Sequence, residues 1–94
     1  MSERVVSVVP EAGLHARPAA KFVETVNEYE ADVRIARADS DDDLVAAASM
    51  IAVASLGVAS GDDLRIVTEG EDADEALEAL EGVLTASEDE LPDL

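Results

Sequence analysis

The hydrophobic period of this 94-residue chain switches repeatedly between about two and about 3.6, and this alternation constrains its fold most. Four segments have the β-branched or alternating pattern of strands: residues 4–9, 31–37, 44–47 and 64–68. Three segments have the apolar spacing or the composition of helices: residues 16–29, 48–56 and 72–84. The predicted order of elements is therefore βαββαβα.

The pattern within the predicted strands indicates how these elements pack. In residues 31–37, Val33 and Ile35 lie on one face and Asp32 and Arg34 on the other, as in a half-buried strand. Such alternation predicts an antiparallel sheet with helices on one face, an α+β open-faced two-layer β-sandwich. A ferredoxin-like split βαβ fold has nearly the same order of elements, so the pattern alone leaves both topologies open.

The length of the chain favours a single domain over residues 1–94, because it is sufficient for one modest core. The acidic segment 86–94 is predicted to fray at the end of that domain. Gly57 is predicted to cap the short helix, and Asp72 with Glu75 resembles a capping box at the start of the last one.

The charge of the chain is strongly unbalanced, with 23 acidic residues against 6 Lys and Arg and a net charge of -17. Such a surface repels nucleic-acid phosphates and anionic membranes, so we expect neither as a partner. Dense carboxylates are tolerable where salt screens them, which favours an origin in a salt-rich cytoplasm. The chain has no cysteine and no apolar run of signal-peptide or membrane-helix length, so we expect a cytoplasmic protein. We also expect a monomer.

The only histidine of the chain, His15, lies in the stretch EAGLHARPAA, residues 11–20. Proline is tolerated only in the first turn of a helix, so Pro18 predicts that a helix begins within a residue or two of Ala16. His15 then lies at the N-terminal end of that helix, where unpaired N–H groups and the positive end of the helix dipole favour an anion. The same field disfavours imidazolium and leaves a neutral, nucleophilic ring.

Arg17 adds a guanidinium whose fork suits phosphate oxygens. We therefore predict that His15 accepts a phosphoryl group, held by Arg17 and by the first-turn amides of Ala16 and Arg17. A metal site needs more nitrogen or sulfur ligands than one histidine supplies, and we expect neither a metal nor a cofactor. A catalytic triad needs a nucleophile elbow that this chain lacks. The remaining alternative is a surface histidine that only caps a helix.

The stretch GLHARPAA resembles the active-site motif of HPr, the histidine-containing phosphocarrier family of the phosphoenolpyruvate-dependent sugar phosphotransferase system. A second stretch, ASMIAVASLGV at residues 48–58, resembles the segment around the regulatory serine of that family. The two stretches have the family's separation, apart from a longer Asp-rich turn at residues 39–43. The resemblance extends from Arg4 to about Thr85 and favours the open-faced sandwich over the ferredoxin-like fold.

The resemblance also implies a function. His15 matches the histidine that receives a phosphoryl group on Nδ1 from phosphorylated Enzyme I and passes it to a sugar-specific Enzyme IIA domain. Arg17 matches the arginine beside that histidine. The chain would thus be a carrier and not an enzyme, since catalysis lies in its partners. Three alternatives stay open: a carrier for a dihydroxyacetone kinase system, a regulatory module whose contacts are switched by phosphorylation, and a ferredoxin-like small-ligand domain in which His15 has no special role.

Ser49 matches the serine that a dedicated kinase phosphorylates in some members of the family. Ala48 stands where a basic residue can precede that serine, so we favour a structural role for Ser49 as N-cap of the short helix.

Met50, Ile51 and Ala54 match the apolar patch with which the family docks its partners. Glu24 and Asn27 stand where the family often has lysines, so we expect docking to rely on a different charge complementarity.

Overall fold

The computed structural model describes residues 2–9, 16–38 and 44–85. The elements in these residues are β1 (Ser2–Ser7), α1 (Ala16–Asn27), β2 (Asp32–Arg37), β3 (Val45–Ala46), α2 (Met50–Ser55), β4 (Asp63–Glu69) and α3 (Ala73–Thr85). Their order confirms the predicted βαββαβα arrangement. The predicted acidic tail at residues 86–94 lies outside the described residues.

The four strands form one antiparallel sheet in the order β1-β4-β2-β3. Strand β4 lies in the interior of the sheet, where Leu64 is paired with Val6 of β1 and Ile66 with Ile35 of β2. Strand β3 is shorter than the predicted segment 44–47, because only Val45 and Ala46 pair with β2. The predicted four-stranded antiparallel sheet is confirmed.

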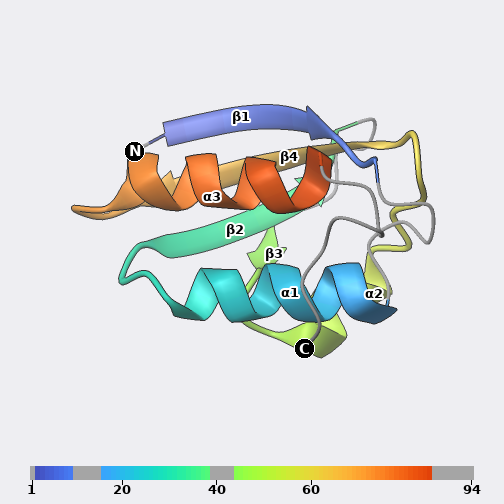
Figure 1. Ribbon diagram of the computed structural model, residues 1–94, viewed down its shortest axis with the longest axis horizontal. Helices are drawn as coiled ribbons and strands as arrows, with labels where there is room; N and C mark the ends of the chain where they lie inside the picture. The colour runs from blue at the N-terminus through green and yellow to red at the C-terminus, as the bar shows by residue number, and fades with distance from the viewer. Residues whose placement is uncertain (1, 10–15, 39–43, 86–94) are drawn as a thin grey trace.

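The helices cover one face of this sheet, and the other face is open (Figure 1). The covered face carries buried side chains from three strands, namely Val6, Val33, Ile35, Leu64, Ile66 and Thr68. On the open face, Glu3, Val5, Arg34 and Arg65 are exposed. This difference between the two faces is that of an open-faced α+β sandwich, as predicted.

The core between the layers comes from the apolar stripes of α1 and α3. The members of these stripes that are fully or almost fully buried are Ala19, Phe22, Val26, Ala76, Leu77, Leu80 and Leu84. Phe22, the only phenylalanine of the chain, has no exposed surface. None of the helices in the described residues is long and apolar enough to cross a membrane.

Gly57 and Asp72 are two residues at helix ends with a defined structural role. Gly57 follows α2 with a φ of +65, which confirms the predicted glycine at the end of that helix. The carboxylate of Asp72 accepts hydrogen bonds from the backbone N–H groups of Glu30, at 2.9 Å, and Ala31, at 2.8 Å. Asp72 therefore ties the start of α3 to the turn between α1 and β2.

Candidate functional site

The predicted phosphoryl acceptor, His15, lies outside the described residues, which resume at Ala16. Helix α1 begins at Ala16, so Pro18 is in its first turn, as predicted. Pro18 is buried there. A proline at this position removes no helical hydrogen bond, since the N–H groups of the first turn have no partner within the helix. His15 thus immediately precedes the first residue of α1 in the sequence.

The N-terminus of α1 differs in charge from that of α3. The first turn of α1 contains no acidic residue, whereas the first turn of α3 contains Asp74 and Glu75. A carboxylate in the first turn offsets the positive end of the helix dipole, and α1 lacks one. The backbone at the start of α1 therefore favours an anionic group. The backbone of Arg17 belongs to this turn, and its role in holding phosphate remains a prediction.

Val8 and Val9, which follow β1 in the sequence, form hydrogen bonds with two other parts of the chain. The N–H of Val8 donates to the carbonyl oxygen of Asp62 at 2.9 Å, and the N–H of Gly61 donates to the carbonyl of Val8 at 2.8 Å. The N–H of Val9 donates to the carbonyl of Leu84, near the end of α3, at 2.8 Å. These hydrogen bonds fix the position of Val8 and Val9 relative to the loop after α2 and to α3.

Arg37 in turn holds the loop at residues 57–62. Its Nη1 donates to the carbonyl oxygen of Gly57 at 3.0 Å, and its Nη2 lies 3.2 Å from Oδ2 of Asp62. The same Oδ2 accepts from the N–H of Ala59 at 3.0 Å. The sequence did not predict this role of Arg37, because β3 and α2 separate it from Gly57 and Asp62 along the chain and no local pattern indicates the contact.

Ser49 caps the short helix α2, as we favoured. Its backbone is extended, with a φ of -101 and a ψ of 117, and its Oγ accepts from the N–H of Ala52 at 3.3 Å. The side chain is exposed, and phosphorylation of this serine remains a prediction.

Helix α2 also carries the predicted docking patch. Ile51 is 83% exposed and Met50 is 39% exposed, whereas Val53 of the same helix is fully buried. Ala54 is half-buried. The helix therefore uses one side for the core and leaves two large apolar side chains in water.

The cations with described side chains all have a carboxylate partner. The ion pairs are Arg4–Glu81 at 2.7 Å, Lys21–Glu24 at 3.8 Å, Arg34–Asp32 at 3.2 Å, Arg37–Asp62 at 3.2 Å and Arg65–Glu3 at 2.8 Å. Positive charge on the described surface is thus neutralised locally, and the excess negative charge is not.

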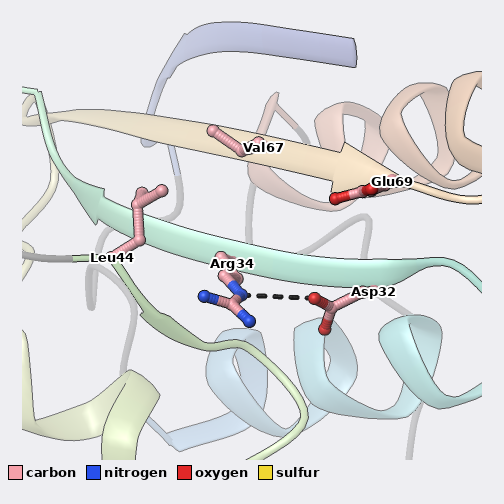
Figure 2. Close-up of a pocket in the computed structure, with 5 residues that line it drawn as sticks. All are labelled: Asp32, Arg34, Leu44, Val67 and Glu69. Carbon is pink, nitrogen blue, oxygen red and sulfur yellow. Dashed lines mark hydrogen bonds and ion pairs between the residues drawn. The ribbon is translucent and has the colours of Figure 1, made fainter. Parts of the chain in front are cut away.

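A pocket lies on the open face of the sheet, away from the helices (Figure 2). It is lined by Asp32, Arg34, Leu44, Val67 and Glu69, and Arg34 and Asp32, both on β2, form an ion pair within this lining. Of the predicted site residues, those with described side chains, namely Ser49, Met50, Ile51 and Ala54, do not line it. Among the described residues, no group of three or more histidine and acidic side chains is arranged to hold a metal ion.

Comparison with known proteins gives one consistent result. The family model described as PTS HPr component phosphorylation site matches residues 2–86. The chain is 60% identical over 86 residues to the phosphocarrier protein HPr of Haloferax volcanii, which covers 92% of this chain and 96% of the relative. It is 41% identical over 93 residues to the phosphocarrier protein HPr of Streptomyces coelicolor, covering 99% of this chain and 98% of the relative.

The solved structures agree. The crystal structure of a phosphocarrier protein HPr from Bacillus anthracis superposes with a TM-score of 0.81 at 41% identity, covering 88% of this chain and 95% of that one.

Proposed function

The chain belongs to the HPr family, the phosphocarriers of the phosphotransferase system, and from this premise we propose that His15 carries the phosphoryl group. A protein of this family is a carrier and not itself an enzyme. The observation that carries the proposal for His15 is its place in the chain, directly before a helix whose first turn holds no carboxylate. That position provides backbone N–H groups and the positive end of a dipole for an arriving anion.

The transfer is reversible. The Nδ1 lone pair of neutral His15 attacks the phosphorus of the phosphorylated donor, and a P–N bond forms while the bond between phosphorus and the donor atom breaks. Arg17 and the first-turn amides of Ala16 and Arg17 hold the phosphoryl oxygens, and the same bonds are exchanged in reverse order on the acceptor. This chemistry needs no cofactor within the carrier.

The donor in this proposal is Enzyme I, and the acceptor is a sugar-specific Enzyme IIA domain. Met50, Ile51 and Ala54 form the docking patch for both, and the exposure of Met50 and Ile51 supports this role. We further propose that the protein acts as a single-domain monomer in the cytoplasm. The identity to an HPr of Haloferax volcanii is consistent with a protein adapted to high salt.

The experiment that tests the proposal is intact mass spectrometry after incubation with phosphoenolpyruvate and the cognate Enzyme I in molar KCl. Wild-type protein should gain one acid-labile phosphoryl group, and His15→Ala should gain none. Arg17→Ala should gain it more slowly, while Arg34→Ala, which removes a cation from the open face of the sheet, should match wild type. If wild type gains no phosphoryl group while Enzyme I phosphorylates itself, the carrier assignment of His15 is wrong and a regulatory binding module becomes the better hypothesis.

A further inference from the structure

Arg37, at the end of β2, contacts both ends of the 57–62 loop, the segment between α2 and β4. Its Nη1 donates to the carbonyl oxygen of Gly57 at 3.0 Å, and its Nη2 lies 3.2 Å from Oδ2 of Asp62. A guanidinium can hold two such partners at once because its N–H donors form a rigid fork. Arg37 therefore connects the first and last residues of the loop through one side chain.

The 57–62 loop needs such a contact because its backbone is permissive at two positions. Gly57 has a φ of +65 and Gly61 a φ of +90, and glycine loses more conformational freedom on folding than any other residue. Between these glycines, Val58 is fully buried in the core. Arg37 adds a fixed point on each side of Val58, one at Gly57 and one at Asp62, and so restricts the loop along its whole length.

The same loop holds the chain that leaves β1. The N–H of Val8 donates to the carbonyl oxygen of Asp62 at 2.9 Å, and the carbonyl oxygen of Val8 accepts from the N–H of Gly61 at 2.8 Å. The carbonyl oxygen of Val9 accepts from Oγ of Ser60 at 3.4 Å. Of the hydrogen bonds that the described residues form with Val8 and Val9, only one goes elsewhere, to the end of α3. The position of these two residues therefore depends mainly on the loop.

The ion pair between Arg37 and Asp62 is better protected from salt than the other arginine pairs of the described chain. The side chains of Arg37 and Asp62 are 28% and 34% exposed, whereas those in the other described arginine–carboxylate pairs are between 40% and 60% exposed. Salt screens a partly buried pair less than an exposed one. The contact between β2 and the loop is therefore expected to persist in molar salt.

We propose that Arg37 is a positioning residue for phosphoryl transfer, which acts by holding the 57–62 loop and, through it, Val8 and Val9. This proposal rests on the carrier function proposed above. His15 lies six positions after Val9 and one position before the start of α1. A segment whose two ends are held has fewer accessible conformations than one held at a single end.

Position matters because phosphoryl transfer needs the acceptor nitrogen in line with the bond that breaks at phosphorus. A misplacement of about 1 Å can lower the rate of such a reaction by about a hundredfold. Removal of Arg37 leaves Val58 in the core and the loop's own hydrogen bonds in place, so we expect a smaller displacement and a smaller loss.

The test is rapid-quench kinetics in 1 M KCl, starting from phosphorylated cognate Enzyme I and varying the concentration of the carrier. The limiting rate constant reports transfer, and the concentration that gives half the limiting rate reports the supply of folded, docking-competent carrier. Arg37→Met should lower the limiting rate constant by about tenfold and leave the half-saturating concentration within about twofold. A loss of stability alone does the opposite, because it reduces the concentration of folded carrier without changing the rate of the folded protein.

Two further variants make the test specific. Arg37→Lys keeps a positive charge opposite Asp62 but has no fork to reach Gly57 as well, so it should recover a limiting rate within about threefold of wild type. The matched control is Arg34→Met, which removes the same kind of side chain and the same charge from the same strand, where its partner is Asp32. This control should match wild type within about twofold.

The other outcomes overturn the proposal. An unchanged limiting rate in Arg37→Met, or a change in the half-saturating concentration alone, means that Arg37 stabilises the fold without positioning the acceptor. An equal loss in Arg34→Met means that the charge of β2 acts without a defined contact. If Arg37→Lys is as slow as Arg37→Met, the ion pair with Asp62 has no part in the effect. Failure of the carrier function is distinguishable, because wild type itself then gains no phosphoryl group in the mass assay.

Discussion

Asp72 connects two turns that are far apart in the sequence, and its removal gives a sharp test of the fold. Its carboxylate accepts from the N–H groups of Glu30 and Ala31, which lie 42 and 41 positions away. The hydrogen bond to Glu30 is exposed, so water replaces the lost acceptor at a net cost of about 1 kcal/mol. Ala31 is only 7% exposed, and a partly buried N–H left without a partner costs about 1–2 kcal/mol.

Asp72→Ala is therefore expected to lower the free energy of unfolding by about 2–3 kcal/mol, which for a domain of this size lowers the Tm by roughly 10–20 °C. The control is Glu75→Ala, which removes an exposed carboxylate from the first turn of α3 and with it only the dipole interaction, about 0.3–1 kcal/mol. Urea titrations at constant KCl give both free energies, and hydrogen exchange reports on the amides of Glu30 and Ala31. If the two variants agree within about 0.5 kcal/mol and the two amides exchange as in wild type, the reasoning about Asp72 is wrong.

Substitutions at four further positions test local features of the fold. Gly70→Ala should destabilise the protein by about 2 kcal/mol, because Gly70 has a φ of +142 and an added Cβ would lie 3.0 Å from a backbone carbon. Gly82→Ala in α3 meets nothing within 4 Å and should instead stabilise by about 0.5–1 kcal/mol, so thermal melts of the pair should move in opposite directions. Ser49→Ala should cost about 1 kcal/mol and Ser49→Asp much less, with faster amide exchange confined to α2, because only aspartate retains a capping oxygen. Arg37→Met should cost about 1 kcal/mol in urea titrations and speed amide exchange of the loop after α2, since this partly exposed arginine holds that loop; unchanged exchange there would contradict its anchoring role.

The features that the sequence predicts correctly are those encoded over a few residues. The start of α1 follows from Pro18, the end of α2 from Gly57, and the N-cap of α2 from Ser49, because each depends on the backbone of its own segment. The two sheet faces follow from alternation, which a strand's period of two makes local as well.

The features that sequence reasoning missed depend on tertiary structure. Asp72 followed by Glu75 has the local pattern of a capping box, yet the carboxylate of Asp72 binds a turn on another part of the chain. Arg37 bonds the loop beyond α2 in the same way. Such partners are set by how the layers pack, and no periodicity along the chain encodes them. The same holds near the candidate site. The start of α1 after His15 is predictable from the local sequence, whereas the hydrogen bonds that position Val8 and Val9 depend on tertiary structure and are not.

The chain and the phosphoryl group that it carries are both negatively charged and repel each other, and the structure indicates what limits this repulsion. A phosphoryl group adds nearly two negative charges to a chain whose net charge is already -17. At high salt the distant carboxylates are screened within a few ångströms, so the electrostatic cost of accepting the group depends on the residues next to it. At the start of α1 those residues include no carboxylate in the first turn, although α3 has two at the same place. The first turns of α1 and α2 hold no acidic residue and that of α3 holds two, so the start of α1, which follows His15 in the sequence, adds no carboxylate of its own to the repulsion of an arriving phosphoryl group.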